Sequence, residues 1–214
     1  MSRRAAGWAL TIVDGLVVAV AVLVVLWHDL SAPRQLDLVS VLDTVTWLAV
    51  PIVFVGVGAL LITRVPGNAT GWLLMAFTTV LATSMVLEIY VVVAADPTSA
   101  GAAAAAWLDN LLYAPAVVLI LAGVPLTFPT GRLLGPRWRL VVALAVVAVG
   151  ISFLKPMFAV GQLSDLVPGL TNPLGVPGAE SWLEVTNLVT SVLALSTIAT
   201  SFWAVVIRYR RGDR

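Results

Sequence analysis

Six long apolar stretches, separated by short polar segments, constrain this chain more than any other feature. Each holds between about 17 and 26 residues with few charges, and a helix needs about 20 such residues to cross the hydrocarbon core of a bilayer. The chain is 60% hydrophobic and only 11% charged, whereas an ordinary soluble domain carries about 25% charged residues. We therefore predict one all-α domain over residues 1–214, a polytopic helical membrane protein. The predicted spans are residues 8–27, 46–63, 71–94, 107–128, 138–154 and 182–207, and the longest loop covers residues 156–181.

The first apolar stretch, Trp8–Trp27, follows Arg3 and Arg4 and has to be distinguished from a signal peptide. A signal peptide has an apolar core of about 7–15 residues and ends in a cleavage site of small residues. This stretch is longer, is interrupted by Asp14 and has no such site. We expect a retained membrane helix, with a tryptophan at headgroup level at each end.

The connection at residues 126–139 contains Arg132, Arg137 and Arg139 among prolines and glycines. Proline fixes φ and glycine tolerates positive φ, so this composition predicts a tight turn. Arginine is costly in hydrocarbon, which places the turn at a water interface. Together with Arg64, these arginines are candidates for binding anionic lipid headgroups, each contributing about 1 kcal/mol. The alternative is that they only set the membrane topology.

The basic residues are strongly segregated by the six predicted spans. Ten of the twelve fall on one side, and only Arg34 and Lys155 fall on the other. An excess of lysine and arginine marks the cytoplasmic side, so we expect both termini in the cytoplasm and residues 156–181 outside. Eleven arginines against one lysine, with abundant alanine and valine, are typical of a high-GC bacterial genome. The expected location is therefore the bacterial plasma membrane.

Two carboxylates inside the predicted spans and away from their ends, Asp14 and Glu88, are candidate intramembrane sites. A charge at the centre of a bilayer costs about 2.5–3.5 kcal/mol or more unless it is paired or hydrated. Counted from Trp8 and Trp72, the two carboxylates differ in depth by about 15 Å, so they cannot share a proton. One explanation is structural, with Asp14 paired to an arginine and Glu88 reaching headgroup water or Tyr90. The other is proton or ion transport.

The loop at residues 156–181 contains eight prolines and glycines but also nine large apolar residues. A disordered segment is usually poor in apolar residues. We therefore predict an ordered cap that folds onto the ends of the helices.

Motifs of catalysis and of cofactor or metal binding are absent from the sequence. Cysteine is absent, histidine occurs once, and neither a phosphate-binding loop nor a nucleophile with its base can be recognised. We expect no catalytic, cofactor-binding or metal-binding residues, no cofactor, no enzymatic activity within these residues and no nucleic-acid partner.

The two arginine-containing turns resemble a known family. The sequences Arg64-x-Pro-Gly-Asn-x-x-Gly-Trp72 and Phe128-Pro-Thr-Gly-Arg-Leu133, the latter followed by Pro136-Arg-Trp138, resemble the membrane region that precedes the kinase in actinobacterial sensor histidine kinases. Asn172-Pro-Leu-Gly175 and the arginines at 208–211 are similar too. The resemblance runs from Arg64 to the C-terminus, and it departs at Leu134-Gly135, where such sequences often have another proline.

This resemblance implies a sensor or input module for a two-component signal transduction system, with candidate sensing residues Asp165, Asn172, Pro173 and Gly175 in the external loop. The 214 residues contain neither a phosphoacceptor histidine region nor an ATP-binding part, so kinase activity is not implied. The expected partners are the lipid bilayer, further copies of the chain in a homodimer or other oligomer, and a cytoplasmic signalling protein or a kinase domain fused after Arg214. A small transporter or channel subunit, or a membrane scaffold, are the alternatives.

Overall fold

The structure is a computed structural model that describes residues 3–31, 38–65, 67–94, 99–165 and 167–212. Within these residues the regular structure is helical, which confirms the all-α prediction, and six segments are long and apolar enough to cross a membrane. The helices are α1 (Arg3–Ser31), α2 (Leu38–Arg64), α3 (Ala69–Val93), α4 (Ala100–Val118), the π-helix η1 (Leu119–Gly123), α5 (Val124–Thr127), α6 (Trp138–Ser152), α7 (Leu154–Phe158) and α8 (Glu180–Gly212).

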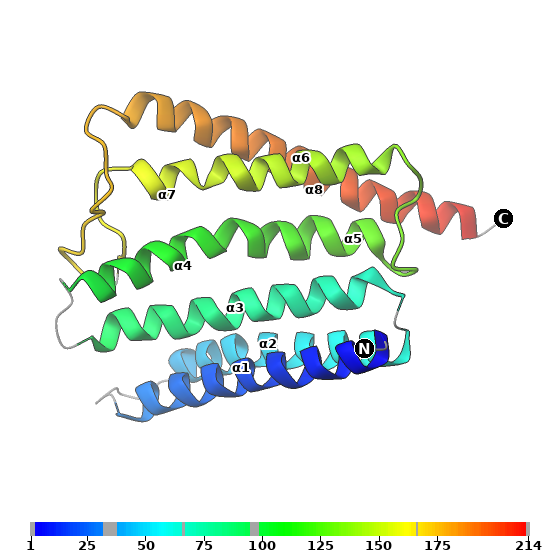
Figure 1. Ribbon diagram of the computed structural model, residues 1–214, viewed down its shortest axis with the longest axis horizontal. Helices are drawn as coiled ribbons and strands as arrows, with labels where there is room; N and C mark the ends of the chain where they lie inside the picture. Colours follow the sequence, from blue (N-terminus) through cyan, green and yellow to red (C-terminus); the bar gives the residue numbers. More distant parts are fainter. Residues whose placement is uncertain (1–2, 32–37, 66, 95–98, 166, 213–214) are drawn as a thin grey trace.

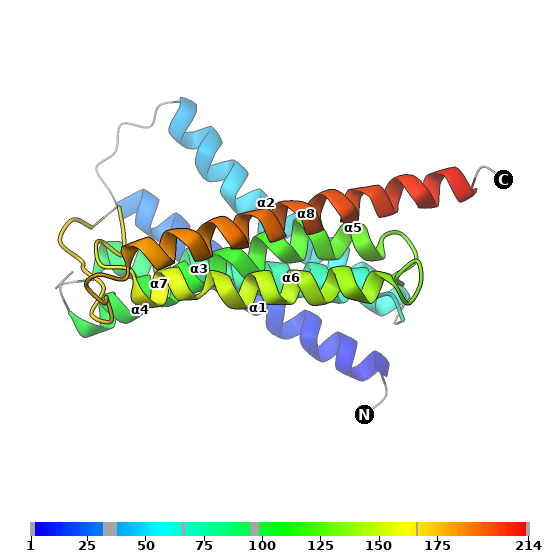
Figure 2. The ribbon, with the colours of Figure 1, turned by 90° about the horizontal axis from the view of Figure 1, so that it is seen from above.

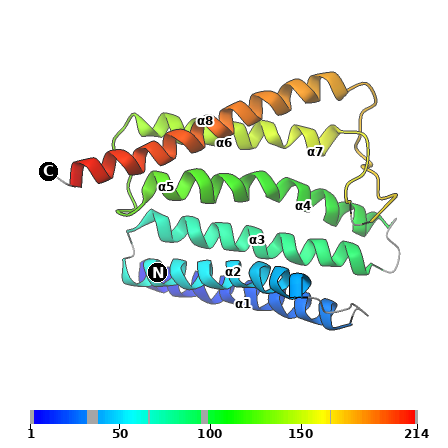
Figure 3. The same ribbon diagram turned by 180° about the vertical axis from the view of Figure 1, so that it is seen from behind.

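Seen from the side, the helices are stacked, with α3 and α4 in the middle of the bundle (Figures 1 and 3). Helices α1 and α2 lie on one side of this pair, and α6 and α8 lie on the other. From above, α1 and α2 cross each other at a clear angle, and α8 extends past the ends of its neighbours (Figure 2).

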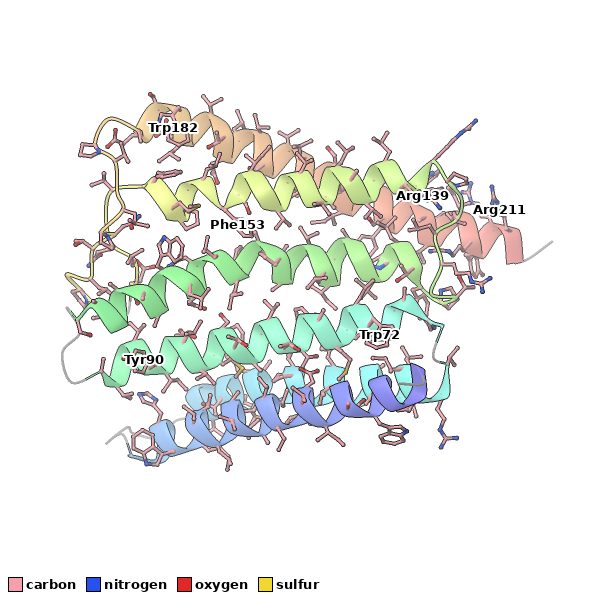
Figure 4. The ribbon with its side chains drawn as sticks, viewed as in Figure 1. Trp72, Tyr90, Arg139, Phe153, Trp182 and Arg211 are labelled. Atoms are coloured by element: carbon pink, nitrogen blue, oxygen red, sulfur yellow. The ribbon has the colours of Figure 1, made fainter. Side chains whose placement is uncertain are left out.

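Both ends of the described chain lie at the same end of the bundle (Figure 1). We call it the arginine end, because it holds the two arginine-containing turns, and Figure 4 shows Trp72, Arg139 and Arg211 there. The opposite end is the cap end, where residues 156–181 lie and where Tyr90 and Trp182 are found. This arrangement follows from an even number of long antiparallel helices.

The helices of the fourth, fifth and sixth predicted spans extend beyond those spans. The fourth helix begins at Ala100 instead of residue 107, because the alanine run 102–106 is helical. Alanine has the highest helix propensity, and the Ser99 side chain accepts a hydrogen bond from the Ala102 amide (3.2 Å) at the N-cap position. The fifth span continues through α7, with Pro156 in the first turn of that helix, where proline is tolerated. The sixth helix extends to Gly212.

Helices α1 and α2 also reach beyond their predicted spans. Residues 38–45 form the first turns of α2, and α1 begins at Arg3 and ends at Ser31. Helix α3, over Ala69–Val93, agrees with its predicted span within about two residues. Helix ends that pass the apolar core are expected, since hydropathy marks only the part of a helix that lies in hydrocarbon.

The fourth span changes from α-helical to π-helical hydrogen bonding between Pro115 and Pro125. Proline has no amide hydrogen, so an α-helix around these positions lacks two of its regular bonds. The π-turn at Leu119–Gly123 contacts α3 and α8 as well as its own helix. Pi-turns inside α-helices are often found at functional sites, and this one leads directly into the turn at the arginine end.

Small residues bring α2 and α3 close together. A Cβ atom added to Gly71 would lie 2.8 Å from the Leu61 side chain, and one added to Gly58 would lie 3.3 Å from the Gly71 carbonyl oxygen. In a membrane, helix packing depends on such close approach because lipid gives no hydrophobic drive for association. Val18 and Ala21 of α1 pack with Ala82 and Met85 of α3 into a buried cluster, which residues of α2 also contact.

Candidate functional site

The two arginine-containing turns pack against each other at the arginine end. Asn68 is 5% exposed; its side-chain oxygen accepts the Thr70 amide (2.9 Å) and its Nδ2 donates to the Pro129 carbonyl (3.2 Å). The first bond caps α3, since Asn is a preferred N-cap residue. The second bond crosses to the other turn, 61 residues later in the sequence.

Gly131 makes this contact between the turns possible. Its φ is +72°, in the left-handed region that glycine adopts without strain. A Cβ atom here would lie 2.5 Å from the Asn68 Cα and 2.6 Å from the Ala69 amide nitrogen. The Gly131 carbonyl accepts the Ala69 amide (3.4 Å). Gly131 is thus required both by its backbone conformation and by the approach of α3.

A buried pair of hydroxyl groups links the two helices beside the turns. Thr70 of α3 and Thr127 of α5 are 2% and 8% exposed, and their Oγ1 atoms are 3.0 Å apart. Thr127 also accepts the Gly131 amide with its carbonyl (2.7 Å). The pair therefore joins α3 to the helix that carries the second turn.

Arg208 of α8 completes the arginine end. Its Nη1 donates to the Pro125 carbonyl (3.0 Å), and its Nη2 donates to the carbonyls of Leu126 (2.5 Å) and Arg132 (2.7 Å). The last carbonyls of a helix have no partner within the helix, and Pro129 has no amide hydrogen for the Pro125 carbonyl. A half-buried guanidinium supplies these bonds from another helix. We call Asn68, Thr70, Thr127, Gly131 and Arg208 the hairpin junction.

The four arginines that the sequence suggested as headgroup ligands differ from Arg208. Arg64, Arg132, Arg137 and Arg139 are exposed at the arginine end, where Figure 4 shows Arg139. Because their side chains remain accessible, their arrangement agrees both with headgroup binding and with a role in topology alone.

At the cap end, residues 156–181 are folded by hydrogen bonds around Asn172. The Asn172 Nδ2 atom lies within hydrogen-bonding distance of the carbonyls of Pro156 (3.1 Å), Met157 (3.3 Å) and Ala159 (2.9 Å). The Asn172 amide donates to the Gly161 carbonyl (2.9 Å). One side chain thus holds the start and the end of the loop together.

Other cap residues contribute to this arrangement in different ways. A Cβ atom on Gly175 would lie 3.0 Å from the Val160 Cα, so the chain passes closely there. Pro173 lines a cavity with Trp107, and Asp165 is exposed. Of the four suggested sensing residues, Asn172 and Gly175 shape the loop, whereas Asp165 and Pro173 are at its surface.

The apolar residues of the cap are divided between the core and the surface. Leu163, Val167 and Leu170 are buried against the ends of α3 and α4, which agrees with the predicted ordered cap. Val160 and Leu174 are exposed, and Leu166 lies outside the described residues. Asn110 of α4 holds the buried part by donating to the Leu163 carbonyl (2.8 Å).

The carboxylates within the helices occupy two separate places. Asp14 is 1% exposed, and Thr79 of α3 donates to its Oδ1 (2.5 Å), while Oδ2 has no partner among the described residues. Thr79 thus replaces the expected arginine. Glu88 lines a cavity of about 360 Å³ with Asp109 and Asp165 at the cap end, and Ser84 donates to Asp109.

Two members of these sites were missed in the sequence. Asp109 lies well inside a helix that starts at Ala100, and it therefore joins Asp14 and Glu88 as a carboxylate within a span. Arg208 looks like the three other arginines that end the chain, and only its distance from the Pro125 carbonyl distinguishes it. The repeated pattern of Arg, Pro, Gly and Trp in the two turns was the one available signal for the junction.

No protein-family model matches this chain, and neither a curated protein nor a solved structure is significantly similar to it.

Proposed function

We propose that this chain is an integral membrane sensor or input module, with the arginine end in the cytoplasm and the cap outside. The observation that carries the proposal is that α8 contacts both candidate sites. Near its start, the Trp182 ring lies 6.1 Å from the Phe158 ring of α7, and Leu183 is buried. Near its end, Arg208 enters the hairpin junction.

A single helix that touches both ends of a bundle can carry a displacement from one end to the other, because helix shifts of about 1–2 Å are a common form of signal transmission. In this mechanism, a change in the cap moves the start of α8. Arg208 then changes its bonds to the carbonyls of α5 and of the second turn, and the exposed end of α8 moves relative to the first turn. A cytoplasmic signalling protein, or a kinase domain linked after residue 214, reads this movement in a homodimer or other oligomer.

The proposed orientation follows from the charges. The exposed Arg64, Arg132, Arg137 and Arg139 lie at the arginine end, and Lys155 lies near the cap. A lysine and arginine excess marks the cytoplasmic side of a bacterial plasma membrane. Since α8 passes the ends of its neighbours (Figure 2), its last turns are available to a cytoplasmic partner.

The experiment measures movement between the first arginine-containing turn, which includes Gly67, and the end of α8. The chain has no cysteine, so cysteines replacing Gly67 and Arg211, both exposed, accept spin labels without background. The labelled protein in nanodiscs is compared with its Asn172→Ala variant, in which the cap loses its central side chain. We expect a shifted or broadened distance distribution in the variant.

The matched control is Leu174→Ala, which changes an exposed cap residue and leaves the Asn172 bonds in place. It should give the wild-type distribution. If Asn172→Ala alters the cap, as judged by proteolysis, and the distance distribution stays unchanged, α8 does not relay and the proposal is wrong.

A small transporter or channel subunit is the second candidate function. The cavity lined by Glu88, Asp109 and Asp165 favours it, because acidic side chains attract cations to one end of a pathway. Asp14, however, lies outside this cavity and is packed against α3. Transport needs a continuous polar path through the bundle, and an acidic cavity at one end is only part of such a path. The sensor is therefore the better supported function.

A further inference from the structure

A cavity of about 460 Å³ lies between α4, α6, α7 and α8 beneath the cap. Its size is in the range of small-molecule sites, about 300–1,000 Å³. The polarity of its lining changes along the helices. Asn110, Lys155 and Asn187 line it near the cap, whereas Val117, Ala148 and Ala194 line it deeper in the bundle.

The length of the cavity follows from the helical rise. Asn187 and Ala194, like Asn110 and Val117, are separated by seven positions, which corresponds to about 10 Å along a helix. The cavity therefore has a polar head region at the cap and an apolar region about one third of a bilayer deep. This is the shape of an amphiphilic molecule that lies along the helices.

Lys155 indicates which charge a ligand in this cavity would carry. It is the only charged side chain that lines the cavity among the described residues, and no acidic residue lines it. The acidic residues of this end, among them Asp109 and Glu184, lie outside it. Among the described residues, Lys155 has no ion-pair partner. A ligand with an anionic group would therefore supply the ion-pair partner of Lys155.

Thr190 gives an independent indication of a ligand. Its Oγ1 is buried and has no hydrogen-bond partner in the described structure, and the residue lines the cavity. On the same helix Thr186, Thr197 and Thr200 each donate to a carbonyl of the preceding turn, the usual solution for a helical threonine. A buried hydroxyl without a partner is costly, and an oxygen of a ligand in the cavity would satisfy it.

We propose that this cavity binds a single-chain anionic amphiphile, with its phosphate or carboxylate head at Lys155 and Thr190 and its acyl chain between α4, α6 and α8. This proposal names the class of ligand that the sensor would detect. Its physiological role rests on the proposed sensor function, whereas binding itself does not. Bound at this place, the molecule contacts both α8 and the cap residues Gln162 and Leu163. Its presence can therefore alter the contact on which the relay depends.

The binding experiment uses the full chain in nanodiscs of zwitterionic phosphatidylcholine, with dodecyl phosphate as the probe and native mass spectrometry as the readout. Dodecyltrimethylammonium has the same chain with the opposite charge, and inorganic phosphate has the head group alone. We expect one dodecyl phosphate per chain and no comparable binding of the other two. Lys155→Gln should weaken binding about tenfold, since it removes a charge-assisted bond.

Two pairs of variants separate the cavity from the surrounding lipid. Ala194→Phe fills the cavity and should abolish binding, whereas Leu195→Phe, on the exposed face of the same helix, should not. Thr190→Val should weaken binding about threefold, whereas Thr200→Val, whose hydroxyl bonds to its own helix, should not. Lys155 is exposed, so Lys155→Gln tests the proposal even where Ala194→Phe fails to fold.

Binding of the ammonium probe as tight as that of dodecyl phosphate, or binding unchanged in both Lys155→Gln and Ala194→Phe, would show partitioning into bulk lipid and overturn the proposal. Dodecyl phosphate binding with the expected variant pattern, but without movement between positions 67 and 211, leaves the site established and removes the sensor function. The two failures are thus distinguishable.

Discussion

Arg208 donates to the Pro125 carbonyl the hydrogen bond that the backbone of the local helix cannot provide. Its Nη1 lies 3.0 Å from this oxygen, across 83 positions of sequence. In a continuous α-helix the amide of residue 129 would make this bond, but residue 129 is a proline without an amide hydrogen. Helix α8 therefore completes the end of the helix that carries the second turn, which explains why these two distant segments are fixed to each other.

The role of Arg208 predicts a large difference between neighbouring arginines. Arg208→Met should destabilise the protein by about 2–4 kcal/mol, because the carbonyls of Pro125 and Leu126, in part-buried bonds, lose a charged donor. Arg210→Met, at an exposed position of the same helix, should stay within about 0.5 kcal/mol. Unfolding of the purified protein in mixed micelles measures both. Equal stabilities would show that Arg208 is merely solvated.

Arg208→Lys should not restore the stability. A lysine presents a compact charge with three donors, whereas the planar guanidinium reaches separate acceptors from fixed positions.

Gly131 should be sensitive even to the smallest substitution. Gly131→Ala forces an L-residue to a φ of +72° and brings its Cβ against Asn68. The strain alone costs about 1–2 kcal/mol, and the separation of the turns adds to it. Gly135→Ala in the same turn meets nothing within 4 Å and serves as the control. The same unfolding assay decides, and a Gly131→Ala variant as stable as the wild type would contradict the proposed close packing.

The charge distribution predicts the membrane topology. A reporter enzyme fused after Arg214 or inserted into the Arg132–Arg139 turn should report the cytoplasm, and one inserted at Gly169, in the exposed part of the cap, should report the outside. The reason is the excess of arginine at one end of the bundle. External readout from the Arg132–Arg139 turn would overturn the proposed orientation.

Asp14 should be replaceable by its amide. The carbonyl oxygen of Asn can accept the Thr79 hydroxyl in the same way as the carboxylate oxygen, so Asp14→Asn should change the stability by less than about 1 kcal/mol. We expect the wild-type protein to conduct no protons in proteoliposomes, so Asp14→Asn should show the same absence of flux. A measurable flux in the wild type that disappears in Asp14→Asn would instead support the transporter.

The cap should resist proteolysis when the protein is reconstituted with this end outward. Leu163, Val167 and Leu170 are buried, and removing several large apolar side chains from water stabilises the folded loop by about 1.5–3 kcal/mol for each. Cleavage between residues 160 and 178 should therefore be slow in the wild type and faster in Asn172→Ala. Rapid cleavage of the wild type under conditions that spare the helices would show that the cap is not folded in the membrane.

The sequence by itself determined the all-helical fold and its six helices that are long and apolar enough to cross a membrane, because apolar length is a local property that neighbours in sequence share. It also located the two turns and the cap, since proline, glycine and arginine act at their own positions. The start of the fourth helix was missed because the alanine run 102–106 reads as neither polar nor strongly apolar, although alanine favours helix.

Only the tertiary structure decided which distant residues meet. Thr79 rather than an arginine reaches Asp14 across 65 positions, and Asn68 meets Pro129 across 61. The same is true of the cavity that Lys155 and Thr190 both line. Hydropathy fixes how deep a residue lies along its helix, but not the direction in which its side chain points or the neighbour that it faces. Those depend on how the helices are rotated and packed, which in lipid is set by close contacts between small residues and by individual hydrogen bonds.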